Sequence, residues 1–339
     1  MLDDLYEYIE ELSDPPEEFG KPYFSQKRYY EPVKIEKKNL SRFEVVEQGR
    51  KICCIDGGNN KIFESPTDSI HLIRAYFNLF KREKRVINTE PMTAFLISKL
   101  DENKVIAKLR IISGEIPLHR KEFVFEERDL EELTLDNAAH SVRKYLEWEL
   151  IEYVVQEYLH ENDILVRDGV LKTTVESERE YAERAYSEIK KGKVTLIGIA
   201  KTSSLRTTKN YPLIAAVQQL ARDVGMRRWY YHPVAENSHP DHKGELYIVK
   251  YHPSSNYAFR TEFYREVDVD HEKVLSELAF QAKDPIFLGY PYGLVDADKR
   301  ARVTDEEVEY LKNMAKNKMK NSFRDKINSI NAHDRLSQI

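Results

Sequence analysis

The hydrophobic positions of the chain follow two periods, and their order predicts a mixed α/β protein. Runs rich in β-branched and aromatic residues predict strands over Lys51–Ile55, His71–Phe80, Thr93–Lys99, Val105–Ser113, Asp163–Arg167, Val194–Ala200, Glu245–Tyr251 and Ala258–Arg265. Apolar residues at helical spacing predict helices over Leu2–Leu12, Asn137–His160, 176–191, Pro212–Val224, His271–Gln281 and from Asp305 onward. The first four strands suggest an antiparallel meander. Strands and helices wrapped around one sheet place the chain in the α/β class.

Three predicted parts follow one another along the chain. A short helix and an arm rich in Pro and Tyr occupy residues 1–45, the alternating strands and helices fill 46–304, and a helical tail covers 305–339. No internal repeat and no low-complexity linker is present in the sequence. With 41% hydrophobic residues among 339, the chain can bury a sizeable core.

The composition predicts a cytoplasmic protein. The sequence has no run of about 18 uncharged apolar residues that would span a membrane. Its acidic N-terminus lacks the basic region and apolar stretch of a secretory signal. Cys53 and Cys54 are adjacent, so in a strand they point to opposite faces and are not expected to form a disulfide. A reducing compartment is the simpler expectation.

The net charge of −5 does not by itself indicate nucleic-acid binding. A carboxylate-rich metal site can nevertheless lower the net charge of a DNA-binding enzyme while basic residues line the DNA path. The charge is uneven, because residues 1–18 are strongly acidic and Lys312–Lys326 is strongly basic. The basic run can contact DNA or simply face solvent, and the sequence leaves both open.

Two aspartates stand at the ends of predicted strands, and each is followed by glycine. Asp56 follows Lys51–Ile55 and is expected to enter a tight turn with the two glycines after it, and Asp168 precedes Gly169. Carboxylates that project from neighbouring strand ends can share metal ions about 4 Å apart, and glycine permits close approach of backbone, metal and phosphate. The alternative is that both Asp-Gly pairs are only turn residues.

Further carboxylates lie on the predicted helix between these aspartates. Glu147, Glu149 and Glu152 all fall on it; Glu149 borders the apolar stripe and can point toward the sheet, and Glu152 follows one turn later. A third carboxylate would complete a metal cage, because Mg²⁺ and Mn²⁺ prefer oxygen ligands. Glutamates on a helix are, however, more often solvated.

A later cluster contains two more aspartates. Pro291 and Gly293 predict a turn, and Asp296 and Asp298 after it can supply another oxygen ligand. Asp298 can equally cap the helix that follows.

One lysine ends a predicted strand. Lys201 follows Val194–Ala200 and precedes a polar loop with Arg206 and Lys209. A cation there can hold a phosphate or stabilise charge that develops on it. The alternative is an exposed lysine in a polar loop.

Other cofactor and nucleophile motifs lack support. His232, His239, Asp241 and His242 superficially resemble metal ligands, but their loop has no Cys partner and no HExxH spacing, which disfavours zinc. The sequence contains no Walker A motif, no GxGxxG and no GxSxG, so ATP hydrolysis, dinucleotide binding and serine hydrolysis are not indicated.

Taken in order, these motifs resemble the NurA family of nucleases. The matching segments are Ile55-Asp56-Gly57-Gly58, Arg143 with Glu149 and Glu152, Asp168-Gly169-Val170-Leu171, Ile197-Gly198-Ile199-Ala200-Lys201, and Tyr290-Pro291 with Leu294 and Ala297-Asp298. They run from about residue 50 to about residue 303. Each motif is short, so the specificity lies in their order and spacing.

The resemblance implies an RNase H-like core and a metal-dependent DNA nuclease. Members of this archaeal and bacterial family are 5′→3′ exonucleases and single-strand endonucleases that use Mn²⁺ or Mg²⁺. They form toroidal homodimers and work with the hexameric ATPase HerA in resecting DNA ends during double-strand-break repair. The mechanism expected from this likeness is two-metal phosphodiester hydrolysis.

The resemblance also assigns roles to residues. Asp56 and Asp168 would be metal ligands, and a helix glutamate would be a third. Aligning the family on Arg143 favours Glu152 for that role, whereas the apolar stripe favours Glu149, and both stay open.

The last motifs complete the expected site. Lys201 would neutralise the non-bridging phosphate oxygens, Tyr290 would lie beside the site, and Asp298 would be a further ligand. Many relatives carry His at the position of Asp298, so metal preference can shift toward harder cations. The interval between Asp56 and Asp168 looks long for the family and holds Glu115 as a spare carboxylate. The rival interpretations are a non-catalytic subunit that binds DNA or an ATPase, and a different RNase H-like enzyme.

Overall fold

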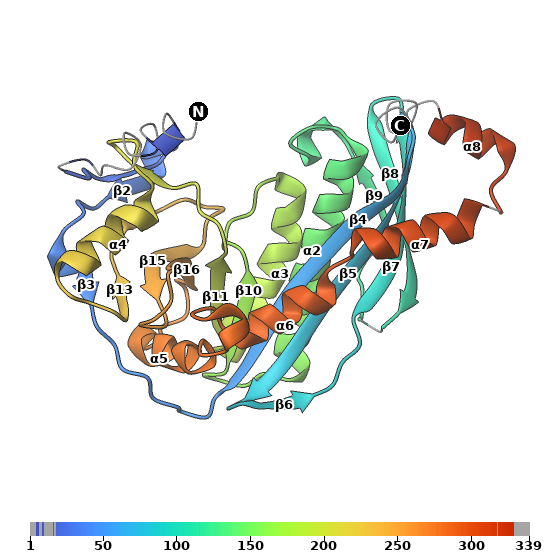
Figure 1. The fold of residues 1–339 in the computed structure, drawn as a ribbon. Helices are drawn as coiled ribbons and strands as arrows, with labels where there is room; N and C mark the ends of the chain where they lie inside the picture. Colours follow the sequence, from blue (N-terminus) through green and yellow to red (C-terminus); the bar gives the residue numbers. More distant parts are fainter. Residues whose placement is uncertain are drawn as a thin grey trace. The chain divides into compact units, whose positions relative to one another are not determined.

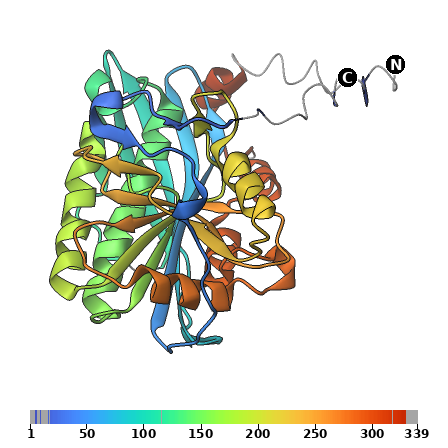
Figure 2. The ribbon, with the colours of Figure 1, turned by 90° about the vertical axis from the view of Figure 1, so that its left-hand side faces the viewer.

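The computed structural model describes Leu5, Tyr6, Ile9, Pro16 and residues 18–114, 116–316 and 318–328. The chain folds into two compact units (Figures 1 and 2). Unit 1 takes the chain up to Gln48, residues 169–171 and residues 197–291, and unit 2 takes residues 49–168, residues 172–196 and the chain from Tyr292 onward. Glu115 and most of the helix predicted over Leu2–Leu12 lie outside the described residues.

A large mixed sheet forms the core of unit 2. Its strands in spatial order are β10 (Ile164–Asp168), β4 (Lys51–Glu64), β5 (Asp68–Lys81), β7 (Met92–Asp101), β8 (Lys104–Ser113) and β9 (Glu122–Phe125), and β6 (Lys84–Ile87) pairs with β5. β10 runs parallel to β4, and the other pairs are antiparallel. The predicted meander and the mixed α/β class are confirmed.

Helices cover both faces of this sheet. The helices of this unit are α2 (Leu135–Glu157), α3 (Glu176–Gly192), α6 (Tyr292–Ala301), α7 (Asp305–Lys316) and α8 (Asn321–Asn328), with a short 3₁₀ turn, η3 (Glu127–Asp129). The α2 helix begins after Thr134, whose side chain accepts a hydrogen bond from the Asn137 N–H (3.1 Å). In Figure 1, α6 and α7 cross β4 and β5 on the side opposite to α2.

The glycines of β4 explain how closely helices approach from both sides. A Cβ at Gly57 would lie 2.6 Å from Glu147 Oε1 of α2, and a Cβ at Gly58 would collide with the Ala301 carbonyl at the end of α6. Neighbouring strand residues point to opposite faces, so each glycine admits one helix. The tight turn expected after Asp56 is therefore wrong: β4 continues through both glycines to Glu64, paired with β5.

Unit 1 is built around a second, antiparallel set of strands. Their spatial order is β3 (Leu40–Ser41), β13 (Trp229–Tyr231), β15 (Gly244–Lys250), β16 (Phe259–Tyr264) and β11 (Thr195–Ala200), of which β11 enters this unit at Ile197. Two short strand pairs also belong to this unit: β1 (Pro22–Tyr23) with β12 (Arg206–Thr207), and β2 (Tyr30–Pro32) with β14 (Ala235–Asn237). Its helices are α4 (Leu213–Asp223) and α5 (His271–Gln281), and its 3₁₀ turns are η1 (Lys27–Tyr29), η2 (Lys37–Asn39) and η4 (Pro285–Phe287).

A buried charged cluster lies within unit 1. Glu262 on β16 is fully buried and accepts hydrogen bonds from Arg260 Nε (2.6 Å), the Leu171 N–H (2.7 Å) and His242 Nε2 (2.9 Å). Burial raises the pKa of Glu262, but Arg260 and His242 outweigh it and lower the pKa to about 2. This carboxylate therefore fixes the backbone just after Gly169.

The described helices include none that is long and apolar enough to cross a bilayer.

Candidate metal centre

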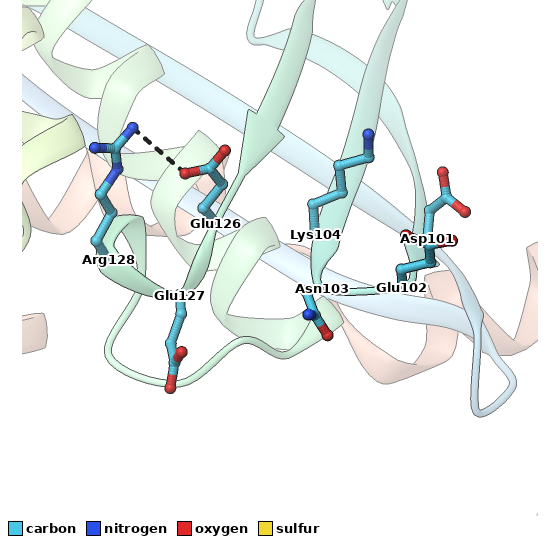
Figure 3. Close-up of a pocket in the computed structure, with 7 residues that line it drawn as sticks. All are labelled: Asp101, Glu102, Asn103, Lys104, Glu126, Glu127 and Arg128. Atoms are coloured by element: carbon cyan, nitrogen blue, oxygen red, sulfur yellow. Dashed lines mark ion pairs between the residues drawn. The ribbon is translucent and has the colours of Figure 1, made fainter.

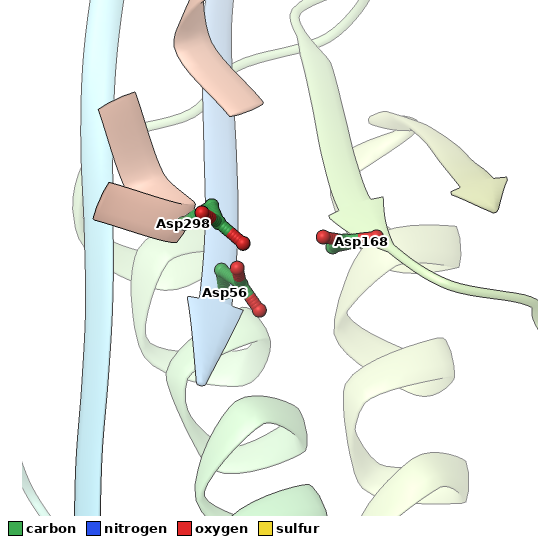
Figure 4. Close-up of side chains that lie close together, drawn as sticks. All are labelled: Asp56, Asp168 and Asp298. Atoms are coloured by element: carbon green, nitrogen blue, oxygen red, sulfur yellow. The ribbon is translucent and has the colours of Figure 1, made fainter. Parts of the chain in front are cut away.

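Three aspartates of unit 2 converge on one spot. Asp56 of β4, Asp168 of β10 and Asp298 of α6 each offer a carboxylate oxygen, and these oxygens lie within 4.8 Å of one another (Figure 4). All three side chains are half-buried. Among the described His, Cys, Asp and Glu residues, these three aspartates form the one group of at least three whose potential ligand atoms lie this close together.

Strand register places the first two aspartates together. In the parallel pair, Val166 lies opposite Cys54 and Arg167 opposite Ile55. One further step along this register brings Asp168 level with Asp56. Residues that lie opposite each other on neighbouring strands point to the same face of the sheet, so the Asp56 and Asp168 side chains project from one face.

The third aspartate reaches the site from a helix. Asp298 lies inside α6 and forms an ion pair with Arg302 (2.7 Å), one turn later. Its alternative role as a cap of the next helix is wrong, since α7 begins at Asp305 and Thr304 Oγ1 accepts the Glu307 N–H there (3.2 Å). The predicted turn at Gly293 is also wrong, because this glycine belongs to the first turn of α6.

The α6 helix is held against β4 and β5 by polar and apolar contacts. Asn78 of β5 donates to the Gly293 carbonyl (2.7 Å) and to Asp296 Oδ2 (2.8 Å), and Arg85 pairs with Asp296 (2.7 Å). A Cβ at Gly293 would lie 2.5 Å from Cys54 Sγ. Asp296 therefore anchors α6 to the sheet, and this places Asp298, two residues later on the same helix, in the aspartate cluster.

On the opposite face of β4, a buried ion-pair array faces α2. Glu147 pairs with Arg143 and with Arg167 Nη2 (3.0 Å), and the Arg167 guanidinium lies 4.2 Å from the centre of the Trp148 ring. Burial lowers the pKa of Arg167, but the nearby Glu147 and Glu178 carboxylates together outweigh this effect and the pKa is raised. The array holds β4 and β10 in register directly behind the aspartates. Arg167, beside Asp168, had no sequence signal beyond that adjacency.

Glu149 and Glu152 belong to a different cluster on α2. Glu149 accepts the His119 N–H (3.2 Å), and Glu152 meets His119 Nε2 (3.2 Å) and Arg184 Nε (3.4 Å). Burial is the main cause that raises the pKa of Glu149 to about 7. Neither glutamate joins the group formed by Asp56, Asp168 and Asp298.

Lys201 and Tyr290 lie together in unit 1. Lys201 follows the last residue of β11 and is exposed, whereas Tyr290 is buried. The Lys201 ammonium lies 6.0 Å from the centre of the Tyr290 ring. A cation at the face of a tyrosine ring is attracted by the π electrons.

The histidines of the 232–242 segment contact protein groups. His242 bridges Tyr30 and Glu262 through its two ring nitrogens (2.8 and 2.9 Å). His239 Nδ1 accepts the Asp241 N–H (3.0 Å), and His232 pairs with Glu245 (3.1 Å).

A polar surface hollow lies at the turn between β7 and β8, away from these clusters in sequence. It is lined by Asp101, Glu102, Asn103, Lys104, Glu126, Glu127 and Arg128 (Figure 3). Glu126 and Arg128 pair with each other there (3.4 Å) and are largely exposed. The hollow contains none of the converging aspartates.

The donor set of the aspartate cluster suits a hard divalent cation. Three carboxylates that meet within 4.8 Å repel one another unless positive charge lies between them. Oxygen donors are preferred by Mg²⁺ and Mn²⁺. The nearby Cys54 thiol is fully buried, and burial raises its pKa, so it does not offer a thiolate.

Comparison with known proteins identifies the family. The NurA domain model matches residues 50–303. The crystal structure of the NurA nuclease from Sulfolobus solfataricus is similar with a TM-score of 0.50 and 13% identity, over 93% of each chain. Endonuclease V of Ciona intestinalis, in complex with DNA, is similar with a TM-score of 0.40 and 10% identity, over 81% of this chain and 93% of that chain. The catalytic domain of human endonuclease V is similar with a TM-score of 0.36 and 10% identity, over 78% of this chain and 89% of that chain. No curated protein sequence matches.

The family match spans most of the 339 residues, and the Sulfolobus structure shares the fold over nearly the whole chain. The α/β fold with an RNase H-like mixed sheet is thereby confirmed. The chain belongs to the NurA family.

Proposed function

We propose that the protein is a divalent-metal-dependent nuclease that hydrolyses phosphodiester bonds in DNA. The observation that carries this proposal is the convergence of Asp56, Asp168 and Asp298 from two strands and a helix. Family membership and the likeness to a NurA nuclease support the same reaction. Mn²⁺ or Mg²⁺ bound there would polarise the scissile phosphate and lower the pKa of an attacking water.

The chain's own groups would hold and orient the reactants. Asp56 and Asp168 would bind the cation from the sheet, and Asp298 from α6, with two ions being our proposal from the family. The Arg302 guanidinium, which pairs with Asp298, limits how that carboxylate can turn. From the resemblance to the family, Lys201 would neutralise a non-bridging phosphate oxygen, and its ammonium lies 6.0 Å from the centre of the Tyr290 ring.

The finer description follows from the family. We propose 5′→3′ exonuclease and single-strand endonuclease activity, a homodimer, and a cytoplasmic role in DNA end resection with a HerA-type ATPase. We do not include Glu149 and Glu152 in the proposed metal site, because Glu149 contacts His119 and Glu152 contacts both His119 and Arg184.

The test is cleavage of DNA labelled at the 5′ or 3′ end, single- or double-stranded, with Mn²⁺, Mg²⁺ or EDTA. We expect metal-dependent cutting that Asp56→Asn and Asp168→Asn abolish. Asp101→Asn, on the surface hollow, is a matched carboxylate control that should cut normally. RNA of the same sequence tests the substrate class. Absence of cutting with every metal would refute the proposal and favour a non-catalytic DNA- or ATPase-binding subunit.

A further inference from the structure

Unit 1 carries exposed aromatic side chains whose role the proposed chemistry does not explain. Tyr257 is 57% exposed, Phe287 is 38% exposed, and Ile286 beside it is 78% exposed. We call these three residues the aromatic ledge. Large apolar side chains grouped at the surface commonly mark a binding site.

The two rings of the ledge are stacked on each other. Their centroids lie 5.5 Å apart with planes 21° from parallel. Phe287 also meets the buried Tyr290 edge-on, with centroids 5.5 Å apart. Since the Lys201 ammonium lies 6.0 Å from the Tyr290 centroid, one series of contacts links the ledge to that cation.

The backbone holds the ledge in place without a ligand. Asp284 Oδ1 accepts the Ile286 N–H (2.8 Å) at the start of η4, and the buried Ser255 hydroxyl accepts the Tyr257 N–H (3.0 Å). Gly289, with φ of +95°, packs directly against Ser255, where a Cβ would collide with the hydroxyl group. The two segments that carry the rings are thus fastened together, so little conformational entropy would be lost on binding.

We propose that Tyr257 and Phe287 form a stacking platform for unpaired nucleobases of a single-stranded DNA end. Exposed aromatic faces near a cation are the features that bind single strands, because rings stack on bases while the cation meets the phosphates. A cation near the ledge favours a polyanionic strand over a purely apolar protein partner. The inference rests on the proposed function, because it specifies which form of DNA the site takes.

The test measures binding without turnover. Full-length Asp56→Asn protein is titrated into a fluorescent single-stranded oligonucleotide, an abasic oligonucleotide of equal length, and a blunt duplex. In this background we compare Tyr257→Ala and Phe287→Ala with the parent. Tyr310→Ala is the matched control, because Tyr310 on α7 is a similarly exposed tyrosine (63%) in unit 2. Tyr257→Phe keeps the ring and removes only the hydroxyl.

We expect each alanine variant to weaken single-strand binding by about 5- to 150-fold, the range of one lost base stack. Abasic and blunt-duplex binding should change little, and both Tyr257→Phe and Tyr310→Ala should match the parent. Unchanged single-strand affinity, or an equal loss for the abasic strand, would overturn the inference. The inference would also be overturned if the alanine variants bound single strands normally but changed in sedimentation coefficient, because the ledge would then be a protein–protein interface. If the wild type did not cleave DNA but binding still depended on the bases and on the two rings, the nuclease proposal would be refuted and the stacking platform would stand.

Discussion

A single methyl group at Gly58 should displace the helix that carries Asp298. A Cβ there would lie 3.0 Å from the Ala301 carbonyl carbon, 3.3 Å from the Arg302 Cα, and closer still to the Ala301 carbonyl oxygen. Real Cβ atoms essentially never approach another heavy atom within 3.0 Å, and the obstacle here is backbone rather than a flexible side chain. We therefore expect α6 and β4 to separate by about 1 Å in Gly58→Ala.

The displacement has a cost in activity as well as in stability. Overpacking of this kind lowers the free energy of unfolding by about 1–3 kcal/mol. Asp298 stands one turn before the obstructed carbonyl, so its oxygens should move away from Asp56 and Asp168. A shift of about 1 Å at a catalytic group can reduce the rate about 100-fold. Cleavage should thus fall far more than the folded fraction does.

The assay compares metal-dependent DNA cleavage and urea unfolding for wild type, Gly58→Ala and Gly192→Ala. Gly192 ends α3, and a Cβ there would meet side-chain atoms at an ordinary 3.5 Å, so this variant controls for adding a methyl group. Raising the Mn²⁺ concentration should partly restore cleavage by Gly58→Ala if ligand placement is the cause. Cleavage at the wild-type level in a folded Gly58→Ala protein would refute the argument that close packing of α6 places Asp298.

Three further expectations concern charge. Glu262→Gln removes the carboxylate that faces Arg260 and His242 in a fully buried position, so the free energy of unfolding in urea should fall by about 3–5 kcal/mol; a loss below about 1 kcal/mol would contradict this. Burial is the main cause that raises the pKa of Glu149 from 4.5 to about 7, so the unfolded chain loses this proton at lower pH than the folded chain does. The free energy of unfolding should therefore decline between these pH values by about 3–4 kcal/mol. Glu149→Gln should remove that decline in urea titrations at pH 5 and pH 8, and an unaltered pH dependence would show another group is responsible. Asp298→His should shift the preference from Mg²⁺ toward Mn²⁺, because imidazole is the softer ligand; an unchanged Mn²⁺/Mg²⁺ rate ratio would argue against Asp298 as a ligand.

The strands and helices of the sequence were largely predictable because their patterns are local. The α5 helix has the predicted bounds, His271–Gln281, and α2 ends within three residues of the predicted end, His160. The pairing of Asp56 with Asp168 was also within reach, since each aspartate follows a short apolar run, and two such runs paired in parallel bring the aspartates level. The cluster found in the structure contains both.

The parts that failed depend on contacts distant in sequence. Asp-Gly-Gly is a turn signal by local statistics, yet Gly57 and Gly58 continue β4 because helices from residues 147 and 301 need the space. The partners of the α2 glutamates also come from distant segments of the chain. Glu149 accepts the His119 N–H, and Glu152 accepts a hydrogen bond from Arg184, contacts that the spacing along α2 does not reveal.

The placement of the three aspartates on separate elements implies that the site depends on packing rather than on any one segment. Asp56 and Asp168 are fixed by strand register, and that register is supported from the opposite face by Glu147 between two arginines. Asp298 is fixed by the glycines that let α6 approach the sheet. Because carboxylates brought this close repel one another in the absence of a cation, the packing must hold them against that repulsion. Binding of a divalent ion should therefore raise the stability of unit 2 as well as prepare it for catalysis.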